Sequence, residues 1–225
     1  QDGADRVVEE IVVTGLRKES NLQDTAITIT AITASDLETK QLENFEDLQF
    51  AVPTLTFAKG AYSGAGISLR GIGNFAVGNS SSNAIGYFWN GQTASQSGLY
   101  EAEFFDVERI EVLRGPQGTL FGSGTTGGAV QLVTKRPDAV FGGNVKVDIA
   151  DYDSRSLSGA ITVPLSDNLR SRFAFASLKR DGFVTNNYNG ETLDDRNTMA
   201  GRATFEWHYS DDTTVSLIYE NTTAD

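Results

Sequence analysis

The hydrophobic pattern of the chain changes character near residue 137. Downstream, in residues 138–225, apolar and polar side chains alternate in about five segments, as they do in strands with one apolar and one polar face. Upstream, in residues 26–137, short alternating runs are separated by turns and by one stretch with helix-like spacing. The pattern predicts an α+β domain over residues 26–137, antiparallel strands over residues 138–225, and a separate N-terminal segment over residues 1–25.

Each of the downstream segments has one polar and one apolar side. Their apolar side chains are, in order, Val145, Val147 and Ile149; Leu157, Ile161 and Val163; Phe173 and Phe175; Met199, Ala203, Phe205, Trp207 and Tyr209; and Val215, Leu217 and Tyr219. Short turns at residues 166–168 and 210–212 alternate with a long segment at residues 181–196, as the connections of a transmembrane barrel do, although the turn near Asp153 is short. A soluble β-sandwich shows the same alternation, so this pattern alone leaves both architectures open.

A helical region is predicted between a buried strand at residues 26–33 and Pro53. Ser35 and Glu38 have the spacing of a capping box, and Asn44 is expected to cap a second short helix before Pro53 ends the pattern. The side chains expected to supply core contacts are Leu37, Gln41, Leu42, Phe45 and Leu48.

The stretch from Phe105 to Pro137 contains two strand-like runs around a turn that is rich in glycine. Residues 107–113 alternate as a half-buried strand would, and residues 129–134 extend again after the glycines. A turn of this composition is expected where the backbone passes so close to other atoms that a Cβ would not fit.

Composition narrows the possible function classes. The 225 residues include 30 acidic and 18 basic side chains, a net charge of -12, which argues against nucleic acid as a partner. Cysteine is absent, which excludes disulfides, zinc–thiolate sites and cysteine nucleophiles. His208 is the one histidine and is expected to be a polar wall residue. Because no catalytic motif is present, we expect no enzyme activity, no catalytic or metal site and no cofactor.

Hydropathy and the N-terminal residues bear on the location of the protein. No run approaches the roughly 18 apolar residues of a membrane helix, but a transmembrane barrel carries its membrane signal in alternation instead. Gln1 begins a polar, charged stretch without an apolar leader. We therefore expect a mature exported chain from which the signal peptide has been removed.

The segment D-V-E-R-I-E-V-L-R-G-P-Q-G-T-L-F-G, followed by T-T-G-G and T-K-R-P, closely resembles the end of the plug domain in TonB-dependent outer-membrane receptors. The resemblance implies a plug domain followed by the first antiparallel strands of a large transmembrane β-barrel. Plugged transporters use about 22 strands. The barrel is therefore expected to be incomplete in this chain, and the chain to be part of a longer receptor.

The same glycines also match a different motif. Gly122, Gly124 and Gly127 spell G-x-G-x-x-G, a dinucleotide-binding fingerprint, and Asp148 lies about 20 residues further on. That fingerprint requires a helix to begin at the third glycine, so that its N-terminus meets the pyrophosphate. A strand pattern follows here, which argues against a nucleotide site.

A short β-prone run near the N-terminus lies between charged residues and a glycine. Such a segment can add as a strand to the sheet edge of another protein. The run resembles the TonB box of the family, the peptide that the inner-membrane-anchored TonB protein captures and pulls, and its position before the plug favours that interpretation over an ordinary edge strand. The residues of this expected TonB box are Glu9, Glu10, Ile11, Val12, Val13, Thr14 and Gly15.

Two arginines are candidates for a latch between plug and barrel. Arg70 in the sequence G-I-S-L-R-G, and Arg114 in the later motif, resemble plug arginines that pair with barrel-wall glutamates in this family. A guanidinium held by carboxylates in a water-poor interface is costly to separate from them, so such a pair acts as a latch. The alternative is that both are solvated surface arginines.

Three loops at residues 59–65, 74–83 and 90–100 are rich in small, polar and aromatic residues, a mixture suited to an uncharged or aromatic ligand. In the family, plug apices of this kind face the cell exterior and contact the substrate. The expected ligand-binding residues are Tyr62, Asn74, Phe75, Trp89, Gln96 and Tyr100. Where relatives commonly read Y-V-D-G-V, this chain reads Y-F-W-N-G-Q at residues 87–92, so their ligand is not carried over.

The resemblance implies a receptor in the outer membrane of a Gram-negative cell, with the plug apex outside and the TonB box in the periplasm. Its expected partners are TonB, outer-membrane lipid and a scarce small solute, for which ferric siderophores are the leading class. Oligosaccharides, aromatic compounds and cobalamin are alternative solutes, and a passive structural barrel or adhesin is a rival function. A signal transducer carries a folded domain before the TonB box; few residues precede Glu9, which disfavours that role.

Overall fold

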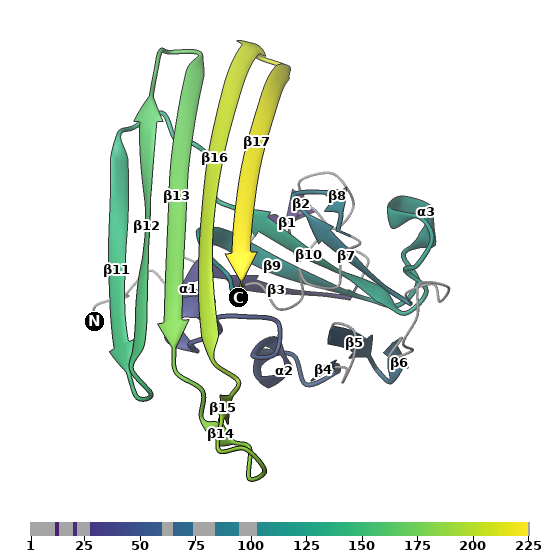
Figure 1. Ribbon diagram of the computed structural model, residues 1–225. Coiled ribbons are helices and arrows are strands. Elements are labelled where there is room, and N and C mark those ends of the chain that lie inside the picture. Colours follow the sequence, from purple (N-terminus) through teal and green to yellow (C-terminus); the bar gives the residue numbers. More distant parts are fainter. Residues whose placement is uncertain are drawn as a thin grey trace, which may run out of the picture. The chain divides into compact units, whose positions relative to one another are not determined.

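The computed structural model describes residues 12–13, 20–21, 28–59, 65–73, 84–94 and 103–224 (Figure 1). The chain divides into two compact units, Gln1–Thr134 and Lys135–Asp225. The first unit combines short helices with strands, and the second is made of antiparallel strands, as the sequence predicts. The limits expected at residues 26 and 137 stay predictions.

The main sheet of the first unit has five strands in the order β3-β9-β10-β7-β8. These strands are β3 (Ile29–Thr33), β9 (Val107–Arg114), β10 (Gly128–Thr134), β7 (Ile85–Trp89) and β8 (Gln92–Thr93). β10 lies at the centre, antiparallel to β9 and parallel to β7. The two strands around the glycine-rich turn are therefore direct neighbours.

Both faces of β9 and β10 are buried, so the prediction of a half-buried strand at residues 107–113 was wrong. Ile110 and Val130 belong to the larger apolar cluster, whereas Leu113 and Ala129 belong to a second cluster with Phe88. Alternation misled here because Arg109 and Glu111, which have the pattern of a solvated face, are buried as well. A central strand covered on both sides does not need an apolar residue at every position if its polar groups are paired.

Two smaller sheets complete the strands of this unit. β4 (Leu55–Lys59), β5 (Ala65–Leu69) and β6 (Ile72–Gly73) form a three-stranded antiparallel sheet, and β1 (Val12–Val13) pairs with β2 (Ser20–Asn21). The strand expected at residues 26–33 is β3, which lies at the edge of the main sheet and has only Ile32 fully buried among its residues. The expectation of a buried strand there was wrong, because β9 is its one neighbouring strand among the residues that the structure describes.

The helices of this unit are short. They are α1 (Ala34–Thr39), α2 (Leu48–Ala51) and α3 (Gly118–Phe121), the last within the glycine-rich turn. The N-caps of α1 and α2 differ from those that the sequence predicts. Thr33 and Asp36, not Ser35 and Glu38, form the capping box of α1, because the same spacing occurs two residues earlier.

Asn44 does not cap α2, and its Oδ1 instead accepts the N–H groups of Glu46 and Asp47 in the turn before that helix. Of the expected core residues, Leu37, Leu42, Phe45 and Leu48 are buried. Gln41 is exposed, because it lies in the turn after α1 with a positive φ of 52°.

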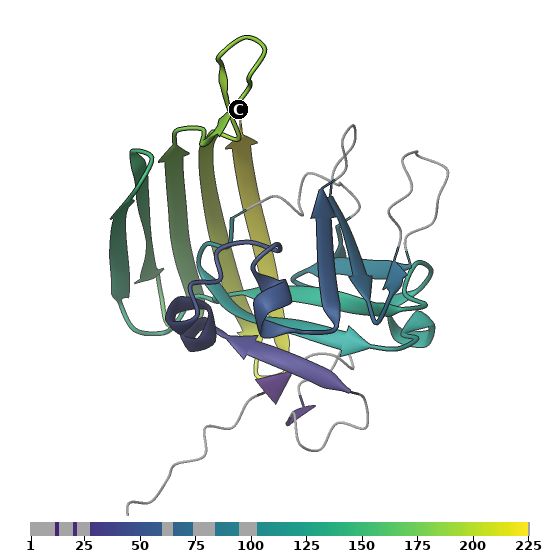
Figure 2. The same cartoon turned by 90° about the horizontal axis from the view of Figure 1, so that it is seen from below.

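The second unit is a five-stranded antiparallel sheet in which each strand pairs with its neighbours along the chain (Figures 1 and 2). The strands are β11 (Gly142–Ala150), β12 (Ser154–Pro164), β13 (Leu169–Arg180), β16 (Arg196–Ser210) and β17 (Thr213–Ala224). The long segment predicted at residues 181–196 contains a small hairpin of β14 (Val184–Thr185) and β15 (Thr192–Leu193). The five predicted strands are confirmed.

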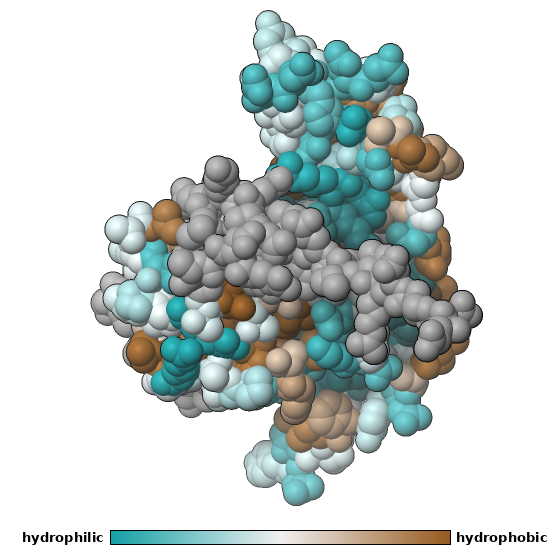
Figure 3. All heavy atoms as spheres, turned by 180° about the vertical axis from the view of Figure 1, so that it is seen from behind, coloured by the Kyte–Doolittle hydropathy of each residue, from teal (hydrophilic) through white to brown (hydrophobic). Residues whose placement is uncertain are grey.

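Apolar side chains of this sheet are exposed, whereas several polar ones are buried. Val145, Ile149 and Leu217 are 70%, 80% and 65% exposed, whereas Thr204 and Glu206 on the polar side are 3% and 4% exposed. Apolar groups are accordingly among those that reach the molecular surface (Figure 3). A soluble β-sandwich requires the reverse arrangement. The alternation of an apolar outer and a polar inner side fits a sheet whose apolar side faces lipid.

Within the described residues, none of the helices has the length and apolar character needed to span a membrane.

Candidate functional site

Only part of the expected TonB box is described by the structure. Val12 and Val13 form β1, which pairs antiparallel with Ser20–Asn21, and Val13 is fully buried. The other residues of the expected box lie outside the described residues: Glu9, Glu10, Ile11, Thr14 and Gly15. Two residues of this β-prone run therefore lie in a strand. The role of the run as a TonB box stays a prediction.

The two expected latch arginines meet at Thr54. The backbone N–H of Arg70 donates to the Thr54 carbonyl oxygen at 2.8 Å, and Arg114 Nε donates to Thr54 Oγ1 at 3.1 Å. Arg114 Nη2 also donates to Thr30 Oγ1 at 2.6 Å. Arg114 thus joins the edge strand β3 to the turn before β4, a link that spacing along the chain does not reveal.

Neither arginine has an ion pair with any other residue that the structure describes. Arg70 is exposed in the turn between β5 and β6 with a φ of 53°, and Arg114 is half-buried. The partner glutamates implied by the resemblance are not among these contacts, so the latch stays a prediction. The hydrogen bonds of Arg114 with Thr30 and Thr54 are a structural role that the sequence did not indicate.

The glycines of T-T-G-G let atoms of four neighbouring strands, β5, β6, β7 and β9, approach the start of β10 closely. A Cβ on Gly127 would lie 2.7 Å from Ile72 Cγ2 and 2.7 Å from Ile85 Cδ1. A Cβ on Gly128 would lie 2.8 Å from Leu69 Cδ1 and would clash with the Leu113 carbonyl oxygen. The expected close backbone approach is confirmed, and the approaching atoms belong to other strands of the first unit.

The dinucleotide-binding interpretation of these glycines is contradicted. Gly122 and Gly124 both have positive φ angles, but the third glycine, Gly127, leads into strand β10. No helix starts there to direct N–H groups at a pyrophosphate. The prediction that a strand and not a helix follows the third glycine is therefore confirmed.

Trp89 is the one expected ligand residue that the structure describes. It ends β7, is partly buried against the larger apolar cluster, and its ring lies edge-on to Tyr87 with centroids 6.4 Å apart. Packing against the core accounts for the indole without a ligand, so its ligand role stays a prediction. The other expected ligand residues lie outside the described residues: Tyr62, Asn74, Phe75, Gln96 and Tyr100.

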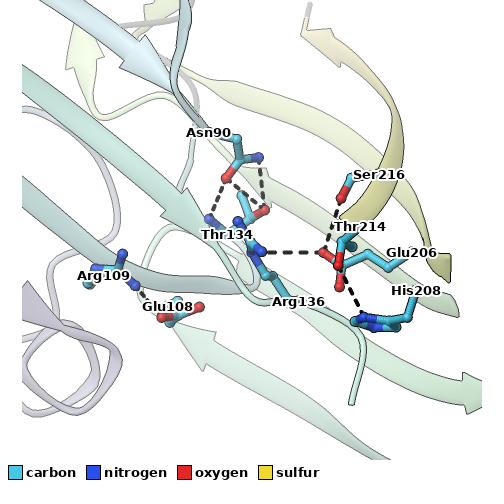
Figure 4. A network of polar contacts seen from close by, with 9 residues as sticks. All are labelled: Asn90, Glu108, Arg109, Thr134, Arg136, Glu206, His208, Thr214 and Ser216. Atoms are coloured by element: carbon cyan, nitrogen blue, oxygen red, sulfur yellow. Dashed lines mark hydrogen bonds and ion pairs between the residues drawn. The ribbon is translucent and has the colours of Figure 1, made fainter. Parts of the chain in front are cut away.

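Asn90 has a structural role that sequence reasoning missed. Its Oδ1 accepts the Thr134 N–H at 2.9 Å, and its Nδ2 donates to Thr134 Oγ1 at 3.0 Å (Figure 4). The Asn-Gly pair at residues 90–91 marks a tight hairpin turn, and both residues have positive φ angles. The turn was thus visible in the sequence, but its contact with a residue 44 positions away was not.

A buried ion pair on β9 was also missed. Arg109 Nε lies 2.8 Å from Glu111 Oε1, the Glu111 side chain is 0% exposed, and Arg109 Nη1 pairs in addition with Glu108 (Figure 4). Removing one member of such a pair leaves an uncompensated buried charge, which is strongly destabilising. The two residues are alternate positions of one strand, so only knowledge of the covering layer could have shown that they are buried.

The polar side of the second unit carries further ion pairs. Arg202 Nε lies 2.7 Å from Glu220 Oε2, and the Arg202 side chain is 1% exposed. Arg136 Nε lies 3.8 Å from Glu206 Oε1, and Ser216 Oγ lies 3.4 Å from the same oxygen (Figure 4). His208 belongs to this side too, with its Nδ1 3.2 Å from Thr214 Oγ1.

The described residues contain no group of three or more His, Cys, Asp or Glu side chains that could hold a metal ion. The site consequently consists of packing, hydrogen bonds and ion pairs that hold a small domain and one polar sheet face in defined conformations.

Comparison with known proteins connects this arrangement to a family. The family model described as TonB-dependent Receptor Plug Domain matches residues 21–129. The chain carries the plug domain of a TonB-dependent receptor. The ferric enterobactin receptor PirA of Pseudomonas aeruginosa is 34% identical over 129 residues, which are 55% of this chain and 17% of PirA. The iron-regulated outer membrane virulence protein of Vibrio cholerae is 29% identical over 190 residues, 79% of this chain and 29% of that protein.

Solved TonB-dependent receptor structures support the architecture. The crystal structure of the ferric yersiniabactin uptake receptor FyuA from Yersinia pestis matches with a TM-score of 0.77 and 23% identity, covering 87% of this chain and 31% of FyuA. At this identity the likeness shows the fold, a plug followed by strands of a receptor barrel. The chain spans 17% to 31% of the length of these three proteins, so the barrel is incomplete here, as predicted.

Proposed function

We propose that this chain supplies the plug and the first wall strands of a TonB-dependent receptor that lies in the outer membrane and imports a ferric siderophore into the periplasm. The relatives that match it include proteins named as receptors for ferric enterobactin, ferripyoverdine and pesticin. The observation that carries the proposal is the plug domain on the same chain as a sheet with an exposed apolar side and a buried polar side. This combination is what a gated membrane pore requires.

In this proposal the plug is the gate, and residues 9–15 are the handle. TonB captures the handle as an added strand and pulls it, and the force rearranges the plug so that the bound solute passes. Such a gate uses segments whose free energy of local unfolding is low, because a moderate force can then open them. The apex residues and the loops around them contact the solute on the outer side, and the latch arginines hold the plug against the wall until force arrives.

Deletion of residues 9–15 from the whole receptor tests this function. In cells that depend on the receptor for iron, radio-iron supplied as ferric enterobactin is expected to bind both proteins but to accumulate inside only with the intact one. A proton uncoupler is expected to abolish uptake by the intact receptor and to leave binding unchanged, because the energy reaches the plug through the handle.

Other outcomes discriminate between the alternatives. Uptake that survives the deletion contradicts energy coupling and favours a passive barrel. Absence of ferric enterobactin binding, with binding of an oligosaccharide, an aromatic compound or cobalamin instead, keeps the receptor and replaces its substrate class.

A further inference from the structure

The chain passes from the plug to the wall sheet through residues 134–136, called the connector here. Thr134 is the last residue of β10 and of the first unit, and Lys135 begins the second unit. Thr134 is held by side-chain contacts within the first unit, and Arg136 by a contact within the second. Lys135 alone therefore lies between two held residues.

On the plug side, the turn between β7 and β8 holds Thr134. Asn90 Oδ1 accepts both the N–H of Thr134 at 2.9 Å and its hydroxyl at 3.2 Å (Figure 4). The turn is itself tied to β10, because the Asn90 N–H donates to the Leu132 carbonyl oxygen at 2.9 Å. Asn90 adopts a φ of 48°, a conformation that asparagine tolerates better than most residues. The backbone and the side chain of Asn90 thus both form hydrogen bonds with the end of β10.

On the wall side, Glu206 of β16 holds Arg136. Glu206 is 4% exposed, and a carboxylate in that setting is costly unless a cation or hydrogen-bond donor compensates it. Its side chain is approached by Arg136 Nε at 3.8 Å and by Ser216 Oγ at 3.4 Å. The 3.8 Å separation is long and the Arg136 side chain is 66% exposed, so the pair is weak and acts mainly through the low exposure of its carboxylate. Glu206 therefore favours conformations in which the Arg136 guanidinium stays beside it.

We propose that Asn90 and Glu206 form a two-sided clasp that keeps the connector fixed while other parts of the plug rearrange. A single residue, Lys135, joins the two held positions and keeps their Cα atoms within about 7 Å of each other, so a displacement of either held segment beyond that reach breaks one side of the clasp. The consequence for transport rests on the proposed function, whereas the clasp itself is a property of the resting protein. In a working receptor, the plug would then open away from this end and would not leave the barrel as a rigid body.

The β3 edge of the plug sheet has the properties of the part that moves. β3 has five residues, a single neighbouring strand and Ile32 as its one fully buried side chain. It also follows the expected handle in the chain, so force on the handle reaches β3 before β10. The contact of Arg114 with Thr30 is the side-chain link that resists its separation from β9.

Amide hydrogen exchange of the whole receptor, resolved to single residues by mass spectrometry, tests the clasp without a ligand. The readout is the Thr134 amide, because its acceptor is a side chain that substitution removes. Asn90→Gly deletes the side chain and keeps the backbone free to adopt a positive φ, and it is expected to speed exchange at Thr134 about tenfold. Asn90→Asp replaces the amide with a carboxylate, whose oxygens accept the Thr134 N–H and hydroxyl, and is expected to stay within about threefold of the unmodified receptor.

Substitutions on the wall side complete the test. Glu206→Gln and Arg136→Gln are each expected to speed exchange at Thr134 about threefold, and the double variant no more than the faster single one, because both remove the same pair. Glu220→Gln removes a different ion pair from the same sheet and is the matched control that leaves Thr134 unchanged. The Val130 amide in the middle of β10 reports whether a variant has disturbed the strand itself.

Three outcomes would overturn the clasp. The first is a Thr134 amide that exchanges as fast as the amides of β3 in the unmodified receptor. The second is no change on Asn90→Gly, and the third is no change on either wall-side substitution. None of these outcomes depends on transport. A failure of the proposed function would appear instead in the uptake experiment with residues 9–15 deleted.

Discussion

At Gly128 the backbone leaves no room for a side chain. Its φ is +146°, and a Cβ would meet the Leu113 carbonyl oxygen and Leu69 Cδ1, atoms of the core that cannot move aside cheaply. Gly128→Ala is therefore expected to lower the free energy of unfolding of the plug by about 2–4 kcal/mol. Urea unfolding of the whole receptor, followed by a probe within the plug, measures the change.

Gly118→Ala is the matched control for Gly128→Ala. Gly118 begins α3, its Cβ would meet nothing within 4 Å, and its φ is not positive. Alanine is expected to be neutral or to stabilise by up to about 1 kcal/mol, because glycine is a poor helix former. Equal losses at both positions would contradict the packing explanation.

At the scale of single elements, α1 depends on a carboxylate at its start. The pKa of Asp36 is lowered by its hydrogen bond with Lys40, then by those with the Thr33 side chain and backbone. A lowered pKa means that Asp36 contributes stability above its ordinary pKa of 3.8, and that this contribution is lost as the pH falls through the folded value. The contribution is moderate, because the Asp36 side chain is 37% exposed and solvent screens the pair.

Asp36→Asn is therefore expected to destabilise the plug at neutral pH by about 1 kcal/mol or less. The difference between the variant and the unmodified receptor should shrink as the pH falls below 3.8 and through the lowered pKa of the folded state, beneath which the carboxyl group is protonated in both states. Urea unfolding at a series of pH values measures both effects. A difference that stays constant across this range would contradict a role for the charge.

For the whole molecule, the inverted sheet of the second unit is the decisive feature. Leu217 is 65% exposed on the apolar side of β17, whereas Thr222 lies on the polar side of the same strand, opposite Ala200. Leu217→Arg is expected to destabilise the membrane-inserted receptor by about 2–4 kcal/mol if the position lies near the middle of the bilayer. The amount of heat-resistant folded receptor in the outer membrane should fall accordingly.

Thr222→Arg places the same charge on the other side of the same strand. It is expected to leave the amount of folded receptor unchanged, because the polar side does not meet lipid. Equal loss with both variants, or loss with Thr222→Arg alone, would contradict the assignment of the apolar side to lipid.

The sequence by itself determined the features that depend on neighbours along the chain. Alternation is a local property with a period of two, so the residue pattern over 138–225 was sufficient to predict five strands and both of their sides. The motif around the glycines identified the plug and indicated a close backbone approach, although the atoms that approach Gly127 and Gly128 come from distant strands. The helix cap was located only approximately, because Thr33 and Ser35 offer the same signal two residues apart.

Only the tertiary structure decided which distant residues meet. The contact of Arg114 with Thr30 spans 84 residues, and that of Asn90 with Thr134 spans 44. The burial of Glu111 depends on layers above and below its strand that no local pattern encodes. Strand order and register place such side chains together, and both result from the packing of the whole domain. For that reason the faces of the strands in the second unit were predictable, whereas the burial of β9 and the clasp at the connector were not.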